Sequence, residues 1–331
     1  MGWKGTLRSI EAASRRAERD AQRRRRELER QRKQLEKMQE LERAAYEVEV
    51  YENHIDLLLS VHKECSASWD WEAIKSTAPP AEPEKTHTHK ELAQAALDEF
   101  KPSLLDKMRK RVDSKRDELA KAVEEAKETD EREYQESLKA HEQELADWEA
   151  SCELASQVLA GDQEAYLDAL RQTNPFSDIA ELGSSIKFQV HDSSLVEAVL
   201  HVKGEDVVPS EVKSLLKSGK LSVKKMPKGK FYELYQDYVC GCVLRIAREL
   251  FALLPIEMVI VNAVSELLNA QTGYMETKPI LSAAIPQETL KNLNLEMIDP
   301  SDSMGNFIHR MTFRKTKGFQ AVEAIEPSEL Q

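Results

Sequence analysis

Hydrophobic residues in the first half of the chain recur at intervals of three, four and seven positions, which is the spacing of one face of a long helix. Residues 7–62 also contain no Gly and no Pro. A second stretch, residues 141–159, repeats the pattern strictly by four and three. We therefore predict two long helices, at residues 1–63 and 91–160. Their apolar seams consist of Leu28, Leu35, Met38, Leu41, Ala45, Val48, Ile55 and Leu59, and of His141, Leu145, Trp148, Cys152, Ala155 and Leu159.

The segment between these helices, residues 64–90, interrupts the pattern. It contains Pro79, Pro80 and Pro83, and proline ends a helix because it lacks a backbone N–H and clashes with the preceding turn. An apolar seam on a long helix has to be covered. The two helices therefore most simply pair with each other as an antiparallel coiled-coil hairpin. Self-association between copies of the chain is the alternative.

The pattern changes after Gly161. A helical linker at residues 161–184 is expected to precede a globular domain at residues 185–319, followed by a loose polar tail at residues 320–331. Short apolar runs predict one buried helix at 231–255 and strands at 186–190, 195–202, 221–225, 257–262, 278–285 and 307–315. Residues 207–216 fit either a further strand or a short helix. The simplest arrangement of these strands is an antiparallel meander. The predicted fold class is α+β: a long α-helical coiled-coil hairpin, then a mainly antiparallel sheet with one buried core helix.

Composition narrows the class of protein. Of the 331 residues, 32% are charged, the net charge is −12 and the mean hydropathy is −0.56. No run approaches the roughly 18 consecutive apolar residues that a membrane span needs, so no membrane partner is expected. The four cysteines form no C-x-x-C pair, and residues 1–16 lack the apolar core of a signal peptide. These features favour a cytoplasmic location.

One segment is strongly basic. Seven lysines and no acidic residue lie between residues 212 and 232, so no local carboxylate neutralises them. The segment favours an anionic partner such as a nucleic-acid backbone, bound without sequence readout. Docking onto the chain's own acidic helix at 113–153 is the alternative. Tyr232 and Tyr235 are candidates for stacking on bases. The candidate nucleic-acid or anion-binding residues are Lys217, Lys220, Lys224, Lys225, Lys228 and Lys230.

A competing hypothesis is enzymatic. Glu211-Val-Lys213 has the E-x-K spacing of restriction-endonuclease-like nucleases, which residues 163–264 weakly resemble. The resemblance implies that Glu211 and a second acid, best Asp192, hold Mg²⁺ while Lys213 steadies the attacking water or the phosphate. On a strand, residues two apart share a face. The same triplet also occurs at residues 125–127 and 276–278, so the pattern is common within this chain.

Other motifs of catalysis or metal binding are absent from the sequence. There is no Walker-type G-x-x-x-x-G-K, no G-x-G-x-x-G, no G-x-S-x-G and no H-E-x-x-H. His87 and His89 have no Cys or Asp close to them in the sequence, and we expect them to be exposed loop residues rather than metal ligands. The leading interpretation therefore includes no cofactor and no metal.

The opening MGWKGTLRS and the block KKMPKGKFYELYQDYVCGCVLRIARELFALLP resemble a family of uncharacterised bacterial coiled-coil proteins. The resemblance implies a bacterial cytoplasmic protein and carries no activity. Our leading hypothesis is a non-enzymatic coiled-coil interaction or scaffold protein. Its coiled coil is expected to bind a protein partner or a second copy of the chain, and its C-terminal head to contact an anionic partner. A metal-dependent nuclease, acting in defence against foreign DNA, is the alternative.

Overall fold

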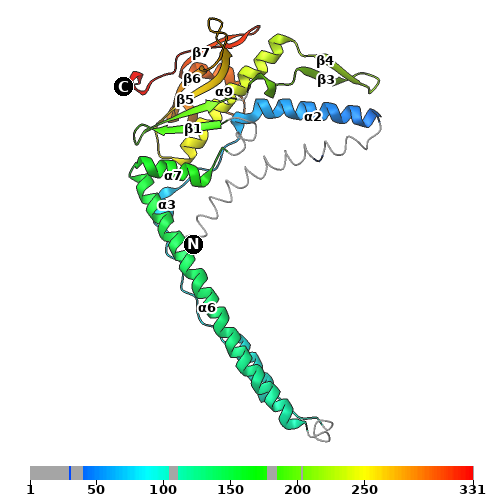
Figure 1. Cartoon of the computed structure of the whole chain (residues 1–331), viewed down its shortest axis with the longest axis vertical. Helices are drawn as coiled ribbons and strands as arrows, with labels where there is room; N and C mark the ends of the chain where they lie inside the picture. The colour runs from blue at the N-terminus through cyan, green and yellow to red at the C-terminus, as the bar shows by residue number, and fades with distance from the viewer. Residues whose placement is uncertain (1–29, 31–39, 104–110, 177–184, 203, 331) are drawn as a thin grey trace. The chain divides into compact units, whose positions relative to one another are not determined.

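The computed structural model describes residues 30, 40–103, 111–176, 185–202 and 204–330, and these form two compact units (Figure 1). The first unit contains residues 73–153. The second contains residues 40–72 and 154–330. Each unit is described by itself.

The first unit is built on a single long helix. Helix α6, Val112–Leu159, has 48 residues and contains neither Gly nor Pro, which accounts for its length. Two segments from the N-terminal side of the unit contact it. They are the chain after α3 (Trp71–Lys75) and helix α4 (Thr88–Asp98), whose first N–H groups donate to Asp130 of α6. The indole Nε1 of Trp148 donates a hydrogen bond to the carbonyl oxygen of Thr77 at 3.0 Å. The seam of α6 is therefore covered in part by the proline-containing connection.

The first predicted helix packs elsewhere. Helix α2, Glu40–Ser60, belongs to the second unit, where it packs against helix α9 (Lys228–Leu253) and strands β3 (Glu211–Leu215) and β4 (Leu221–Lys225). Its residues Ala44, Tyr46, Val48 and Leu58 are buried there. The helical character of 40–60 and 112–159 is thus confirmed, whereas the described residues do not show the predicted coiled-coil hairpin. Residues 1–29 and 31–39 of the predicted helix lie outside the described residues.

The second unit contains a mixed sheet with the strand order β1-β2-β5-β6-β7-β8, which confirms the α+β class (Figure 1). Only β2 and β5 pair in parallel among these strands; the other neighbours are antiparallel. The predicted meander is therefore wrong. After β2 the chain leaves the sheet to form β3, β4 and α9, and it returns beside β2 in the same direction, as a crossover connection requires. The six strands are Ser185–Val190, Leu195–His201, Met258–Leu268, Met275–Pro286, Ile308–Arg314 and Gly318–Gln320.

Helix α9 forms the centre of the core. It packs against β5 and β6, and the side chains of Tyr238, Ile246 and Leu250 are fully buried. Cys240 and Cys242 are buried free thiols in its middle, as small core residues would be. Shorter helices complete the unit: η1 (Val61–Lys63), α7 (Gln163–Thr173), η2 (Glu205–Val207), α10 (Gln287–Lys291), α11 (Pro300–Ser303), η3 (Met304–Asn306) and η4 (Pro327–Glu329).

The C-terminal segment is not loose, so that expectation is wrong. Ile325 is 2% exposed and packs with Leu195, Ile260 and Ala284 in a small apolar cluster. Leu330 packs against the same cluster. A segment with mostly polar residues is thereby held in place by two apolar side chains.

Candidate functional site

The six candidate lysines lie on one small substructure, which we call the lysine hairpin and define as residues 211–230. It comprises β3, β4 and the first residues of α9, and its two strands pair antiparallel in a sheet of their own. The turn is closed by a hydrogen bond from the N–H of Leu216 to the carbonyl of Lys220 at 2.9 Å. Met226, at the end of β4, is buried. The hairpin therefore has a defined backbone on which the lysines are displayed.

All six candidate lysines are exposed. Among the described residues, none of them forms an ion pair, in contrast to the lysine that anchors the hairpin. The hairpin also exposes three large apolar side chains: Leu215, Leu216 and Val223. The surface therefore combines apolar groups near the turn with positive charge that no carboxylate of the described residues pairs with.

Lys213 has a different role from the other six. Its Nζ lies 2.9 Å from Oε2 of Glu47 on α2, and both side chains are half-buried. The pair connects β3 to α2. Lys213 thus fixes the position of the hairpin, and its charge is already balanced within the chain.

The rings of Tyr232 and Tyr235, the two tyrosines proposed for base stacking, both pack against other parts of the protein. Tyr235 is 4% exposed and packs edge-on against Phe319, and burial raises its pKa to about 12. Its predicted stacking role is therefore wrong. Tyr232 is half-buried, and its ring lies over Gly318, where a Cβ atom would come within 2.8 Å of the ring. Both rings serve the contact between α9 and β8.

The residues of the nuclease hypothesis lie on two different sheets. Glu211 and Lys213 are on β3 of the two-stranded sheet, whereas Asp192 is in the turn between β1 and β2. Asp192 accepts hydrogen bonds from the N–H and O–H of Ser194, both at 2.7 Å, and from the N–H of Leu195. These bonds hold the pKa of Asp192 below its ordinary value. Asp192 closes a turn and Lys213 pairs with Glu47, so each has a structural role.

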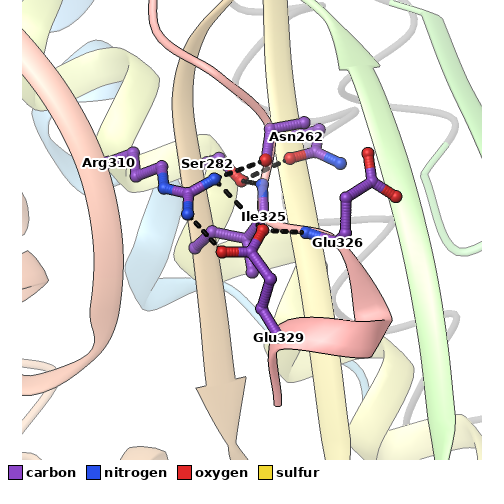
Figure 2. Close-up of polar contacts among 7 residues, drawn as sticks. Asn262, Ser282, Arg310, Ile325, Glu326 and Glu329 are labelled. Carbon is purple, nitrogen blue, oxygen red and sulfur yellow. Dashed lines mark hydrogen bonds and ion pairs between the residues drawn. The ribbon is translucent and has the colours of Figure 1, made fainter.

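A polar row that the sequence analysis did not identify crosses the sheet of the second unit. Its centre is shown in Figure 2: Oγ of Ser282 donates to Oδ1 of Asn262 at 2.5 Å and accepts from the N–H of Ile325 at 2.9 Å. Asn262 in turn donates to Oε1 of Glu197 at 2.8 Å, and Nε2 of His191 lies 2.8 Å from Oε2 of Glu197. The row therefore runs from the β1–β2 turn to the C-terminal segment.

The sequence contained a signal for this row. Asn262 and Ser282 are polar residues inside the two most apolar strands, and buried polar groups need hydrogen-bond partners. What it did not contain was the identity of those partners. They come from β2 and from the tail, which are 65 and 43 residues away.

The C-terminal segment closes over one end of the row. Arg310 donates to the carbonyl of Ala324 at 2.7 Å and forms an ion pair with Glu329 (Figure 2). Glu329 also accepts from the N–H of Glu326 at 2.9 Å. His191, at the other end of the row, lines a cleft of about 900 Å³, to which Pro327 and Leu330 of the C-terminal segment also contribute. The acids Asp192, Glu257 and Glu288 line this cleft, so its charge is opposite to that of the lysine hairpin.

Comparisons with known proteins give no further guide. No protein-family model, curated protein or solved structure matches the chain. Among the described residues, no helix combines the length and the apolar character that a membrane crossing demands.

Proposed function

We propose that this chain is a non-enzymatic interaction protein whose lysine hairpin binds the phosphate backbone of a nucleic acid. The observation that carries the proposal is the display of six exposed lysines on one hairpin, where no described carboxylate pairs with them. Lysine is a flexible point charge that contacts phosphate oxygens without reading bases. The expected mode is therefore electrostatic and independent of sequence.

The structure of the hairpin supports this use in two ways. The Lys213–Glu47 pair and buried Met226 hold the hairpin in place, so the six other lysines are presented together rather than on a loose loop. Local compensation is also low, because Glu211, the cross-strand neighbour of Lys225, is the one acid within the hairpin and the next along the chain is Glu233. Clustered charge of one sign raises the local concentration of an oppositely charged polymer.

The proposal uses the hairpin and does not depend on coiled-coil association. Of the predicted seam on α2, Val48 is buried within its own unit, whereas Leu41 and Ala45 are exposed. Part of the seam of α6 is covered by the segment around Thr77. Scaffolding through self-association of the long helices remains a separate prediction from the sequence, which sedimentation of the full chain at several concentrations would test.

The binding test compares two charge-matched double variants. Fluorescence anisotropy with a labelled 30-base-pair DNA duplex and a labelled single-stranded RNA is measured over a range of salt concentrations. For the wild type, log K should fall linearly with log salt. Lys224→Gln with Lys225→Gln should weaken binding and reduce the slope for duplex DNA by about 1.8, because each phosphate contact contributes about 0.9. The control, Lys121→Gln with Lys139→Gln on α6, makes the same change of net charge at exposed positions of the other unit.

Two results would contradict the proposal. A binding constant that does not change with salt would exclude phosphate contacts as its source. Equal weakening by the two double variants would show that net charge, and not the hairpin, decides binding. The same samples incubated with Mg²⁺ and plasmid test the nuclease alternative, since cleavage that is lost in Glu211→Ala would make the protein an enzyme.

A further inference from the structure

Three potential metal ligands converge in the first unit, away from the lysine hairpin. His89 is in the first turn of α4, and Asp130 and Glu133 are three residues apart on α6, where such residues share a face. One donor atom from each of the three side chains lies within 4.8 Å of the other two. Nε2 of His89 lies 3.2 Å from Oε1 of Glu133.

The carboxylate of Asp130 holds the backbone of α4 at His89. Asp130 is 3% exposed, and its two carboxylate oxygens accept the N–H groups of His89 at 3.0 Å and of Lys90 at 2.9 Å. These are orphan donors of the first helical turn. The carboxylate on α6 therefore orients the turn of α4 that carries the imidazole. Each carboxylate oxygen has a second lone pair, so the same group can also ligate an ion.

The charge around His89, Asp130 and Glu133 also favours a bound cation. Two carboxylates and one imidazole meet there, while the nearby ammonium of Lys85 is engaged with Glu131 and lies over the ring of Tyr134.

We propose that His89, Asp130 and Glu133 form a binding site for a divalent transition-metal ion of the Zn²⁺ type, with water completing the coordination. An imidazole nitrogen with two carboxylate oxygens suits Zn²⁺ or Co²⁺ better than Mg²⁺ or Ca²⁺, which prefer oxygen ligands alone. Metal–ligand distances of about 2.0–2.2 Å require donor atoms roughly 3–4 Å apart. His89 and Glu133 are exposed and free to make that small adjustment, whereas Asp130 is held in place. The ion would link α4 to α6.

The test is isothermal titration of the full-length chain with Zn²⁺, together with the visible absorption of bound Co²⁺. We expect one Zn²⁺ site that is lost or weakened at least tenfold in His89→Gln and in Glu133→Gln, because even the loss of an outer-shell partner commonly costs about tenfold or more. Glu136→Gln is the matched control, since it removes a similar exposed carboxylate three residues after Glu133 on α6. His309→Gln controls for loss of a histidine in the other unit.

Asp130 is not substituted in this test, because its carboxylate satisfies two N–H groups of α4 and its loss would disturb the fold. A second measurement is the melting temperature, which Zn²⁺ should raise in the wild type and in Glu136→Gln but not in Glu133→Gln. The proposal is overturned if 1 mM Zn²⁺ produces no binding signal. It is equally overturned if binding is undiminished in both His89→Gln and Glu133→Gln, since the ion would then be held by other groups.

Discussion

At the scale of single residues, Asp237 on α9 is a buried carboxyl group in the second unit. Its side chain is 7% exposed, and burial raises its pKa to about 6. Hydrogen bonding to Ser301 opposes the rise, whereas the neighbouring carboxylates of Asp299 and Glu233 add to it. A carboxyl group whose pKa is raised on folding stabilises the folded state while it is protonated. It loses this contribution when the pH is high enough to ionise it.

The stability of the second unit should therefore depend on the charge of Asp237. Its favourable contribution is complete below the pKa of the unfolded chain, about 4, and is lost as the pH rises through about 6. Asp237→Asn should raise the free energy of unfolding at pH 7.5 by about 1–3 kcal/mol, since each pKa unit corresponds to about 1.4 kcal/mol. The gain should shrink towards zero near pH 4. Urea unfolding at both pH values measures it, and an equal effect at both would show that charge is not the cause.

At the scale of elements, the contact between α9 and β8 depends on a glycine. Gly318 has φ +73°, and a Cβ atom there would lie 2.8 Å from the ring of Tyr232. Gly273 has nearly the same backbone angle, φ +75°, but no atom within 4 Å of the position of a Cβ. The two glycines share the backbone requirement and differ only in what packs beside them.

This difference can be measured. Gly273→Ala should cost about 1–2 kcal/mol, the penalty for an L-residue in the left-handed region. Gly318→Ala should cost about 1–3 kcal/mol more, because the new methyl group overpacks the contact with Tyr232. Adding Tyr232→Ala to Gly318→Ala should recover part of that excess. Equal costs for the two glycine variants in urea unfolding would contradict the assigned packing.

At the scale of the whole molecule, segments far apart in the sequence complete one sheet. The C-terminal segment covers the face of the sheet that carries Asn262 and Ser282, and Ile325 supplies both an apolar side chain and an N–H to it (Figure 2). Residues that follow the last strand thus belong to the core and not to a free tail.

Ile325→Ala should lower the free energy of unfolding by about 2–5 kcal/mol, the usual cost of removing a buried isoleucine side chain. Met297→Ala is the control, because Met297 is 81% exposed and its truncation should change stability by less than about 0.5 kcal/mol. Denaturant unfolding measures the free energy of unfolding of both variants. A cost for Ile325→Ala no larger than that of the control would mean that the segment is not part of the core.

Most elements could be predicted from the sequence because their signals are local. The alternation around Phe188 and the glycine-bounded run at Val223 place β1 and β4 within one residue of their observed ends. The lysines, too, are visible in the sequence, and their exposure follows from the cost of burying unpaired charge. Glu211 and Asp192 show the opposite case, since a common spacing does not tell which strands will be neighbours.

By itself, the sequence indicated most of the helices and strands, since those signals arise from neighbouring residues. It did not show that the predicted helix at 91–160 is interrupted after Asp98, nor which face of α2 is buried. Only the tertiary structure decided that α2 packs on α9, that β5 returns parallel to β2, and that Asp130 and Glu133 meet His89. The physical reason is that the hydrophobic effect has no preferred direction, so an apolar face can pack against any apolar partner of suitable shape. Which partner it receives depends on the packing of the whole chain.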